Sequence, residues 1–134
     1  MYLLDTNIWL ERMLDQEKSG EVGEFLDEIP SSQLFITDFS LHSIGVILHR
    51  LHRQADFLSF VQDAFIDGAV GLVSIEPESM AHLMTAIDRF GLDFDDAYQY
   101  VAAEMYDMAL ISFDNDFDRT ERGRFTPGDI LSGA

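Results

Sequence analysis

Apolar residues follow two patterns along this chain, and the two patterns alternate. Short, nearly continuous apolar runs are typical of buried strands, and they occur at residues 2–4, 34–36, 70–75 and 108–112. Between them lie longer stretches in which apolar residues recur every three or four positions, as on one face of a helix. These stretches predict helices at residues 8–14, 18–29, 41–51, 57–66, 76–91 and 94–106.

Polar and glycine residues mark several ends of these elements. Asp5 and Asn7 precede the first helix and suit its N-cap, and Gly91 ends the fifth helix. The tail, residues 114–134, is polar and interrupted by glycine and proline. It leaves room for one edge strand around residues 124–125.

The alternation of strands and helices predicts a fold of the α/β class. Successive βαβ units form a mostly parallel sheet, here of four or five strands, with helices on both faces. The chain has 134 residues, of which 47% are hydrophobic. This suits one buried core, so we expect a single domain spanning residues 1–134.

The chain is strongly acidic, since 25 Asp and Glu residues against 8 Lys and Arg residues give a net charge of -17. This argues against a protein that holds polyanions by charge neutralisation alone, so metal ions or a local basic patch must admit any nucleic acid. The lack of cysteine excludes a disulfide scaffold, a thiolate metal site and a cysteine nucleophile. There is no basic segment before an initial apolar stretch and no apolar run of about 18 residues, so we expect no signal peptide, no membrane span and a cytoplasmic location.

Three aspartates lie where an open parallel sheet gathers its ligands, at the carboxyl ends of strands. Asp5 follows the first strand, Asp114 follows the last, and Asp96 lies in the first turn of the helix before the last strand. Carboxylates that converge there repel one another unless a divalent cation lies among them, and oxygen ligands suit Mg²⁺ or Mn²⁺. The pattern predicts a hydrolytic metal centre, in which the cation lowers the pKa of bound water and stabilises charge on a phosphodiester oxygen.

Each of these acids also has a purely structural explanation. An aspartate before a helix is a common N-cap, although Asn7 could cap that helix in place of Asp5. Asp96 could complement the positive end of its helix dipole. A calcium-binding loop beginning at Asp114 is excluded, because the glycine and the final glutamate that such a loop needs are absent.

Three short motifs occur in order along the chain. They are Leu3-Leu4-Asp5-Thr6-Asn7, Asp96-Ala97 leading into Val101-Ala102-Ala103, and Ser112-Phe113-Asp114-Asn115-Asp116-Phe117. Together they resemble the PIN domain family, as found in VapC-type toxins, and the resemblance covers essentially the whole chain. The eighteen residues from Asp96 to Asp114 fit the spacing of that family.

The resemblance implies an α/β/α sandwich around a parallel sheet, metal-dependent cleavage of single-stranded RNA, and a homodimer neutralised by a small antitoxin. By position, it implies that Asp5, Asp96 and Asp114 are the catalytic, metal-binding acids. It also makes Asp116 a candidate fourth metal ligand.

Neutral residues around these acids complete the comparison. Asn7 and Ser112 would support the acids through hydrogen bonds. The family usually has a glutamate early in the helix after the second strand, and Ser43 occupies its place. A hydroxyl is a poor Mg²⁺ ligand, although it can orient a coordinated water, so the departure puts cleavage in question. Three other side chains could compensate for it: Asp38, His42 and Asp93.

A small basic segment follows the last acids. Arg119, Arg122 and Arg124 could bind RNA phosphates that the acidic body repels. Surface pairing with Asp118 and Glu121 explains these arginines equally well.

The sequence therefore predicts an Mg²⁺- or Mn²⁺-dependent endoribonuclease, the toxin of a toxin–antitoxin pair, whose acidic surface suits a small basic antitoxin. The alternative is a catalytically weak or inactive PIN-like domain that acts by binding protein partners. An aspartyl-phosphate phosphatase with Asp5 as nucleophile is disfavoured, because Asn7 stands where that class has an acid and Lys18 is the only lysine.

Overall fold

In the computed structural model, which describes residues 1–133, four parallel strands form one sheet in the order β3-β2-β1-β4. The strands are β1 (Tyr2–Leu4), β2 (Leu34–Thr37), β3 (Gly71–Val73) and β4 (Ala109–Ile111). The helices are α1 (Thr6–Met13), α2 (Ser19–Glu28), α3 (Asp38–Arg50), α4 (Gln54–Val61), α5 (Met80–Phe90), α6 (Phe94–Met105) and α7 (Pro127–Leu131). The predicted α/β class with a parallel sheet is confirmed, and the sheet has four strands.

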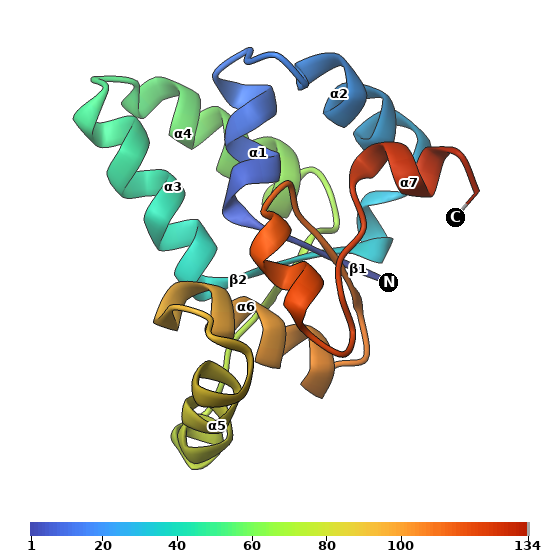
Figure 1. Ribbon diagram of the computed structural model, residues 1–134. Coiled ribbons are helices and arrows are strands. Elements are labelled where there is room, and N and C mark those ends of the chain that lie inside the picture. The colour runs from blue at the N-terminus through green and yellow to red at the C-terminus, as the bar shows by residue number, and fades with distance from the viewer. Residues whose placement is uncertain (134) are drawn as a thin grey trace.

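Helices cover both faces of the sheet, as Figure 1 shows. Helices α1, α2, α3, α4 and α7 lie on one face, where the core includes Leu4, Ile36 and Ile111 from three strands. Helices α5 and α6 lie on the other face and pack against Leu3 and Leu110. Successive side chains of a strand point to opposite faces, so β1 and β4 each contribute to both cores. The result is an α/β/α sandwich.

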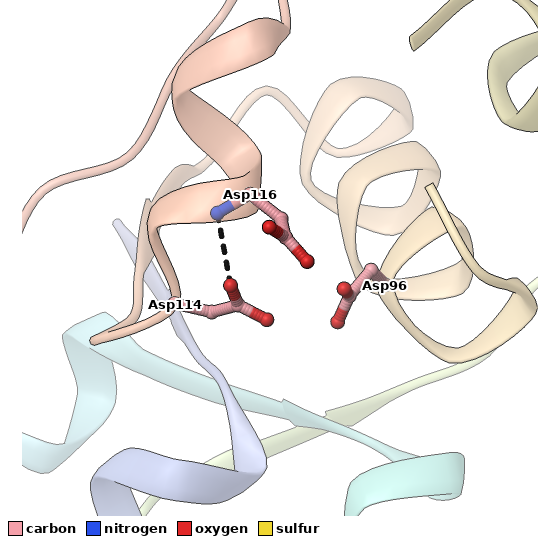
Figure 2. A group of neighbouring side chains, drawn as sticks. All are labelled: Asp96, Asp114 and Asp116. Atoms are coloured by element: carbon pink, nitrogen blue, oxygen red, sulfur yellow. Dashed lines mark hydrogen bonds between the residues drawn. The ribbon is translucent and has the colours of Figure 1, made fainter. Parts of the chain in front are cut away.

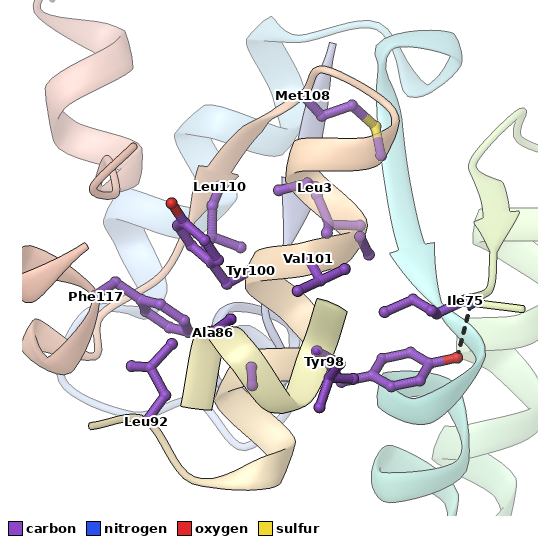
Figure 3. Close-up of a cluster of buried hydrophobic side chains, with 14 residues drawn as sticks. Leu3, Ile75, Ala86, Leu92, Tyr98, Tyr100, Val101, Met108, Leu110 and Phe117 are labelled. Atoms are coloured by element: carbon purple, nitrogen blue, oxygen red, sulfur yellow. Dashed lines mark hydrogen bonds between the residues drawn. The ribbon is translucent and has the colours of Figure 1, made fainter. Parts of the chain in front are cut away.

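The core beneath α5 and α6 also holds the loop that follows β4. Phe117, in the short 3₁₀ helix η4 (Asn115–Arg119), is fully buried in this core with Leu92 and Tyr100 (Figure 3). Gly91 ends α5 with a φ of 65°, a left-handed conformation that glycine adopts at little cost. The chain can therefore turn directly into α6, and α6 and η4 are fixed relative to one another by the core they share.

The tail of the chain is more regular than its composition indicates. The pattern missed α7 because proline and glycine usually interrupt helices, but Pro127 lies at the start of α7, where no helical hydrogen bond is lost. Thr126 caps this helix in a capping box with Asp129. The expected edge strand is reduced to a single parallel bridge between Phe125 and Ile111.

The helix expected at residues 57–66 is divided into α4 and a π-helical turn, Gln62–Ile66. Within residues 1–133, no helix combines the length and the apolar character needed to cross a membrane.

Candidate metal centre

The candidate acids lie at the carboxyl-end edge of the sheet, where β1 and β4 are neighbours. Asp5 follows β1 directly, and Asp114 comes three residues after Ile111, the last residue of β4. Because Leu4 pairs with Ile111, the two segments leave the sheet side by side. Asp96 comes from the first turn of α6. Parallel pairing of two strands far apart in sequence therefore brings these segments together.

Asp96, Asp114 and Asp116 converge on one small region, which we call the acid trio (Figure 2). One carboxylate oxygen from each of the three lies within 4.8 Å of the other two. The backbone N–H of Asp116 donates to Oδ1 of Asp114 at 2.9 Å, which fixes the turn that carries both residues. All three residues are half-buried. Their spacing allows three oxygens to contact a single cation.

Asp5 is nearly buried beside the acid trio, with 7% of its surface exposed. Its Oδ1 accepts hydrogen bonds from the backbone N–H of Thr6 at 2.8 Å and from Nε2 of Gln99 at 2.9 Å. Its Oδ2 accepts from Oγ of Ser112 at 2.7 Å and from Nδ2 of Asn7 at 3.4 Å. Asp5 is thus the N-cap of α1 and is also anchored at both oxygens next to the other acids.

Ser112 and Asn7 connect Asp5 to the loop that carries Asp114. Oγ of Ser112 accepts from the backbone N–H of Asp114 at 3.0 Å and from Nδ2 of Asn7 at 3.3 Å. Oδ1 of Asn7 accepts from the backbone N–H of Phe113 at 3.2 Å. The two residues proposed as supports therefore make hydrogen bonds suited to that role.

Burial and neighbouring charges raise the pKa values of two of these acids. Burial raises the pKa of Asp5 above its usual range, and the hydrogen bond from Gln99 is the strongest of the contacts that oppose this rise. Burial, followed by the charges of Asp114 and Asp93, raises the pKa of Asp96 to about 7. Negative charge is therefore unfavourable here without a counterion, and a cation among the carboxylates would offset the repulsion.

The chemistry of the donor set fits a hard divalent cation. The acid trio offers carboxylate oxygens alone, with no imidazole or thiolate. Such a set suits Mg²⁺ or Mn²⁺ better than Zn²⁺, which favours nitrogen and sulfur ligands.

The position that departs from the family pattern lies on α3, three residues after Ser40. Ser43 is half-buried, and its hydroxyl takes part in none of the hydrogen bonds found within residues 1–133. Of the side chains considered as substitutes, Asp38 accepts from a tyrosine hydroxyl and a backbone N–H, and His42 is exposed. Asp93 caps α6 by accepting from the backbone N–H of Asp96 at 2.8 Å. Asp93 is the one of these three whose charge acts on Asp96.

The three arginines proposed to bind RNA all make contacts within the chain. Arg119 donates to two backbone carbonyls at the end of α5, and its Nη1 lies 3.5 Å from Oδ1 of Asp116. Arg124 pairs with Asp118, as the alternative explanation expects, and Arg122 pairs with an aspartate just after α6. Arg119 is half exposed and adjoins the acid trio, so among the three it is best placed to reach a bound phosphate. RNA binding by these arginines stays a prediction.

Gln99 is a residue of this site that the sequence pattern did not identify. It lies three positions after Asp96 on α6 and is 1% exposed, yet it carries a polar amide. The available signal was a glutamine within an otherwise apolar helix face, since a buried amide must find hydrogen-bond partners.

These features can be compared with known proteins. The sequence model of the PIN domain matches residues 2–123, and the chain therefore belongs to the PIN domain family. The resemblance drawn from the three motifs is thereby confirmed. A comparison with curated proteins found no match.

Several solved structures share the fold of this chain. A chain from a toxin–antitoxin complex of Klebsiella pneumoniae is 19% identical, with a TM-score of 0.75 over 95% of this chain and 98% of that chain. FitAcB from Neisseria gonorrhoeae is 17% identical, with a TM-score of 0.75 over 96% and 99% of the two chains. VapC20 from Mycobacterium tuberculosis, a toxin that cleaves the sarcin–ricin loop, is 14% identical, with a TM-score of 0.74 over 88% and 93%. At these identities, the likeness concerns the fold.

Proposed function

We propose that this PIN domain chain is an endoribonuclease that uses Mg²⁺ or Mn²⁺ to cleave single-stranded RNA, and that it is the toxin of a toxin–antitoxin pair. The observation that carries the proposal is the acid trio, whose carboxylate oxygens lie within 4.8 Å of one another. Support for RNA as the substrate comes from the similar fold of VapC20, a toxin that cleaves the sarcin–ricin loop. Support for the toxin role comes from the similar chain in a toxin–antitoxin complex of Klebsiella pneumoniae.

In this proposal, Asp96, Asp114 and Asp116 hold the cation, and Asp5 completes the acidic site. A bound divalent cation supplies positive charge that lowers the pKa of a water molecule and stabilises charge on a phosphodiester oxygen. Ser112 holds Asp5 and Asp114 at a fixed separation, because its hydroxyl donates to the first and accepts from the N–H of the second. The shared turn holds Asp114 and Asp116 in register.

Cleavage of a synthetic single-stranded RNA by the purified protein tests the proposal. We expect cleavage with Mg²⁺ that EDTA abolishes and Mn²⁺ restores. Asp114→Asn and Asp5→Asn should each lower kcat at least about 100-fold, because several kcal/mol of transition-state stabilisation depend on the metal site. Asp95→Asn is the matched control, since Asp95 is exposed on the same helix as Asp96 and lies outside the acid trio. Cleavage that persists in EDTA and in both site variants would overturn the proposal.

Arg119 is the first arginine to test for contact with RNA phosphates, because it adjoins Asp116 and is half exposed. Arg119→Gln should raise KM for RNA more than it lowers kcat, and it should reduce the dependence of binding on salt. Arg122→Gln and Arg124→Gln, measured in the same way, show whether the rest of the basic segment shares this role. Unchanged KM and salt dependence in all three variants would exclude the segment as an RNA contact.

We propose a small basic antitoxin as the partner, because the net charge of -17 favours a positively charged protein. Their association should weaken as salt increases. Co-purification with the product of a neighbouring small open reading frame, at low and high salt, tests this partner.

We further propose that the chain forms a homodimer in the cytoplasm, and light scattering on the purified protein measures its oligomeric state.

The alternative function is a PIN domain with little or no cleavage that acts through its partner. Ser43 favours it, because this serine adds no carboxylate where the family usually has a glutamate. It predicts no turnover by the wild type with either Mg²⁺ or Mn²⁺, a stable partner complex, and a gain of cleavage in Ser43→Glu. Robust cleavage by the wild type would eliminate it.

A further inference from the structure

Gln99 occupies a fully enclosed position at the edge of the sheet that carries the acids. It is 1% exposed, and the neighbouring Thr37 and Ser40 have no exposed surface. A buried amide without partners is costly, so its hydrogen bonds reveal what the side chain is held against.

These hydrogen bonds leave the amide a single orientation. A carboxylate only accepts, so the atom of Gln99 that lies 2.9 Å from Oδ1 of Asp5 is the donor Nε2. The same Nε2 donates to Oγ of Ser40 at 2.6 Å, and Oε1 accepts from the hydroxyl of Thr37 at 2.7 Å. The Thr37 hydroxyl in turn caps α3 by accepting from the backbone N–H of Ser40.

The amide therefore joins the ends of two strands to α6. Asp5 follows β1, and Thr37 ends β2. Gln99 is three positions beyond Asp96, so the two side chains lie on the same side of α6. The helix that supplies Asp96 to the acid trio therefore also donates a hydrogen bond to Asp5, through Gln99.

The hydrogen bonds of Asp5 differ between its two carboxylate oxygens. Oδ1 is held by short bonds from the Thr6 N–H at 2.8 Å and from Gln99 at 2.9 Å. Oδ2 accepts from Ser112, but its second donor, Nδ2 of Asn7, is 3.4 Å away. Ser112 anchors Oδ2 at 2.7 Å, so both oxygens are held, and the long contact from Asn7 is the one that Oδ2 can exchange most easily for another partner.

We propose that Gln99 is a positioning residue of the candidate metal centre, which orients Asp5 and sets its place relative to Asp96. This inference rests on the proposed function and adds to it a residue that touches neither cation nor RNA. It predicts that loss of the amide weakens metal binding and turnover while RNA binding is kept.

The test is Gln99→Met, which keeps the length of the side chain and removes its three hydrogen bonds. Binding of Mn²⁺ is measured by titration calorimetry at one pH, and kcat and KM are measured on a synthetic single-stranded RNA. The Mn²⁺ affinity and kcat should each fall about 10- to 100-fold, as is typical when a group that orients a metal site is lost, with KM for RNA unchanged. Gln99→Leu gives the same comparison if the methionine variant unfolds.

Tyr98→Phe is the matched control. Tyr98 is the preceding residue on α6, and its hydroxyl accepts from the N–H of Ile75 and donates to Asp38 without touching Asp5. This variant also loses buried hydrogen bonds, so it should have a similarly lowered melting temperature with Mn²⁺ affinity and kcat unchanged.

Three outcomes would separate this inference from the proposed function. Wild-type values in folded Gln99→Met, or an equal loss in Tyr98→Phe, overturn the role of Gln99 and leave the nuclease intact. Weaker Mn²⁺ binding in Gln99→Met, with no RNA cleavage by the wild type, supports the role of Gln99 and overturns the nuclease. A wild type that binds no Mn²⁺ overturns the metal centre and the positioning role together.

Discussion

The carboxylate of Asp5 serves a helix and an acidic site with the same two oxygen atoms. Oδ1 caps α1 through the Thr6 N–H, and Oδ2 reaches Ser112, whose hydroxyl holds the backbone of Asp114. A cap usually leaves its carboxylate in solvent, where ionisation costs little. Here the carboxylate is almost entirely buried, so its hydrogen bonds must replace water.

Asp96 should make the metal-free protein less stable at alkaline pH. Burial and neighbouring charges raise the pKa of Asp96 to about 7 in the folded protein, whereas an aspartate in an unfolded chain has a pKa of about 3.9. A raised carboxyl pKa gives stability that is present below the unfolded pKa and is lost as pH rises through the folded pKa. We therefore expect a lower melting temperature at pH 8 than at pH 5 in EDTA.

Asp96→Asn isolates this effect. At pH 8 in EDTA it should melt a few degrees above the wild type, since about 1 kcal/mol corresponds to roughly 4 °C in a domain of this size. At pH 5 the gain should be smaller. Asp95→Asn, an exposed neighbour, should melt like the wild type at both pH values. An unchanged difference between the two pH values in Asp96→Asn would contradict the assignment.

Sequence reasoning reached part of this site and missed part of it for identifiable reasons. Asp5, Asp96 and Asp114 were placed by strand ends and by motif spacing, both of which are local signals. Gln99 was missed because its importance comes from Asp5, ninety-four residues away, and no local pattern reports that contact. Capping and metal binding are competing explanations of Asp5 in the sequence. In the fold Asp5 caps α1 and also lies beside the other acids, and metal binding by Asp5 stays a prediction.

At the scale of elements, η4 and α6 are held together by apolar packing rather than by the acids they carry. Phe117 of η4 is fully buried in the core that it shares with Leu92 and with Tyr100 of α6 (Figure 3). The acids gathered on the same elements repel one another. The apolar core therefore supplies the stability that close approach of the carboxylates requires.

Phe117→Ala should destabilise the protein by about 3 to 5 kcal/mol, as is usual when a buried phenylalanine is truncated. It should also weaken Mn²⁺ binding, because η4 carries Asp116. Urea unfolding in EDTA and calorimetry measure the two effects. Phe94→Ala is the control, since Phe94 on α6 is 46% exposed and should matter little to either measurement. A Phe117→Ala protein as stable as the control would show that this core does not hold the loop.

Thr126→Ala tests the helix that the sequence pattern missed. Loss of the capping box should lower the free energy of unfolding by about 1 kcal/mol. In the control variant Thr85→Ala, the lost hydroxyl bonds only to a backbone carbonyl within the exposed face of α5, so stability should stay level or rise. Equal stability of the two variants would mean that α7 contributes little to the fold.

The sequence predicted elements that have a clear pattern of apolar residues. It did not predict α7, which is marked mainly by its capping residues. Each of the four apolar runs contains a strand of the sheet. Burial on both faces explains the runs of β1, β2 and β4, whereas Leu72 in the edge strand β3 is 53% exposed. The α7 helix depends on Thr126 and Pro127, which disfavour a helix when they lie in its interior and favour one when they lie at its start. The single bridge at Phe125 depends on where the tail returns to the sheet, which is a property of the folded chain.

At the scale of the whole molecule, the excess of acidic side chains repels itself, and this repulsion is strongest at the acid trio, where three carboxylates lie close together. The net charge is -17, and five of the eight Lys and Arg residues form ion pairs within residues 1–133. Exposed pairs of this kind contribute little to stability. Screening by dissolved salt should therefore matter more than the pairs themselves.

We expect the melting temperature in EDTA to rise as KCl increases from about 20 to about 500 mM, where the screening length falls below about 5 Å. Millimolar Mg²⁺ at constant ionic strength should add a further rise in the wild type and a smaller one in Asp96→Asn. The comparison separates general screening from binding at the acid trio. A melting temperature that falls with KCl would contradict the picture of self-repulsion.

The pairing of Phe125 with the edge strand β4 affects how shortened forms of the protein should behave. The N–H of Phe125 donates to the carbonyl of Leu110 at 2.9 Å, and its carbonyl accepts from the N–H of Ser112 at 3.0 Å. A chain cut after Gly123 would keep Asp5, Asp96, Asp114 and Asp116, but it would leave the Leu110 carbonyl and the Ser112 N–H unpaired and free to bond a strand of another molecule. Such a fragment should self-associate edge to edge, so the returning tail protects the molecule against aggregation.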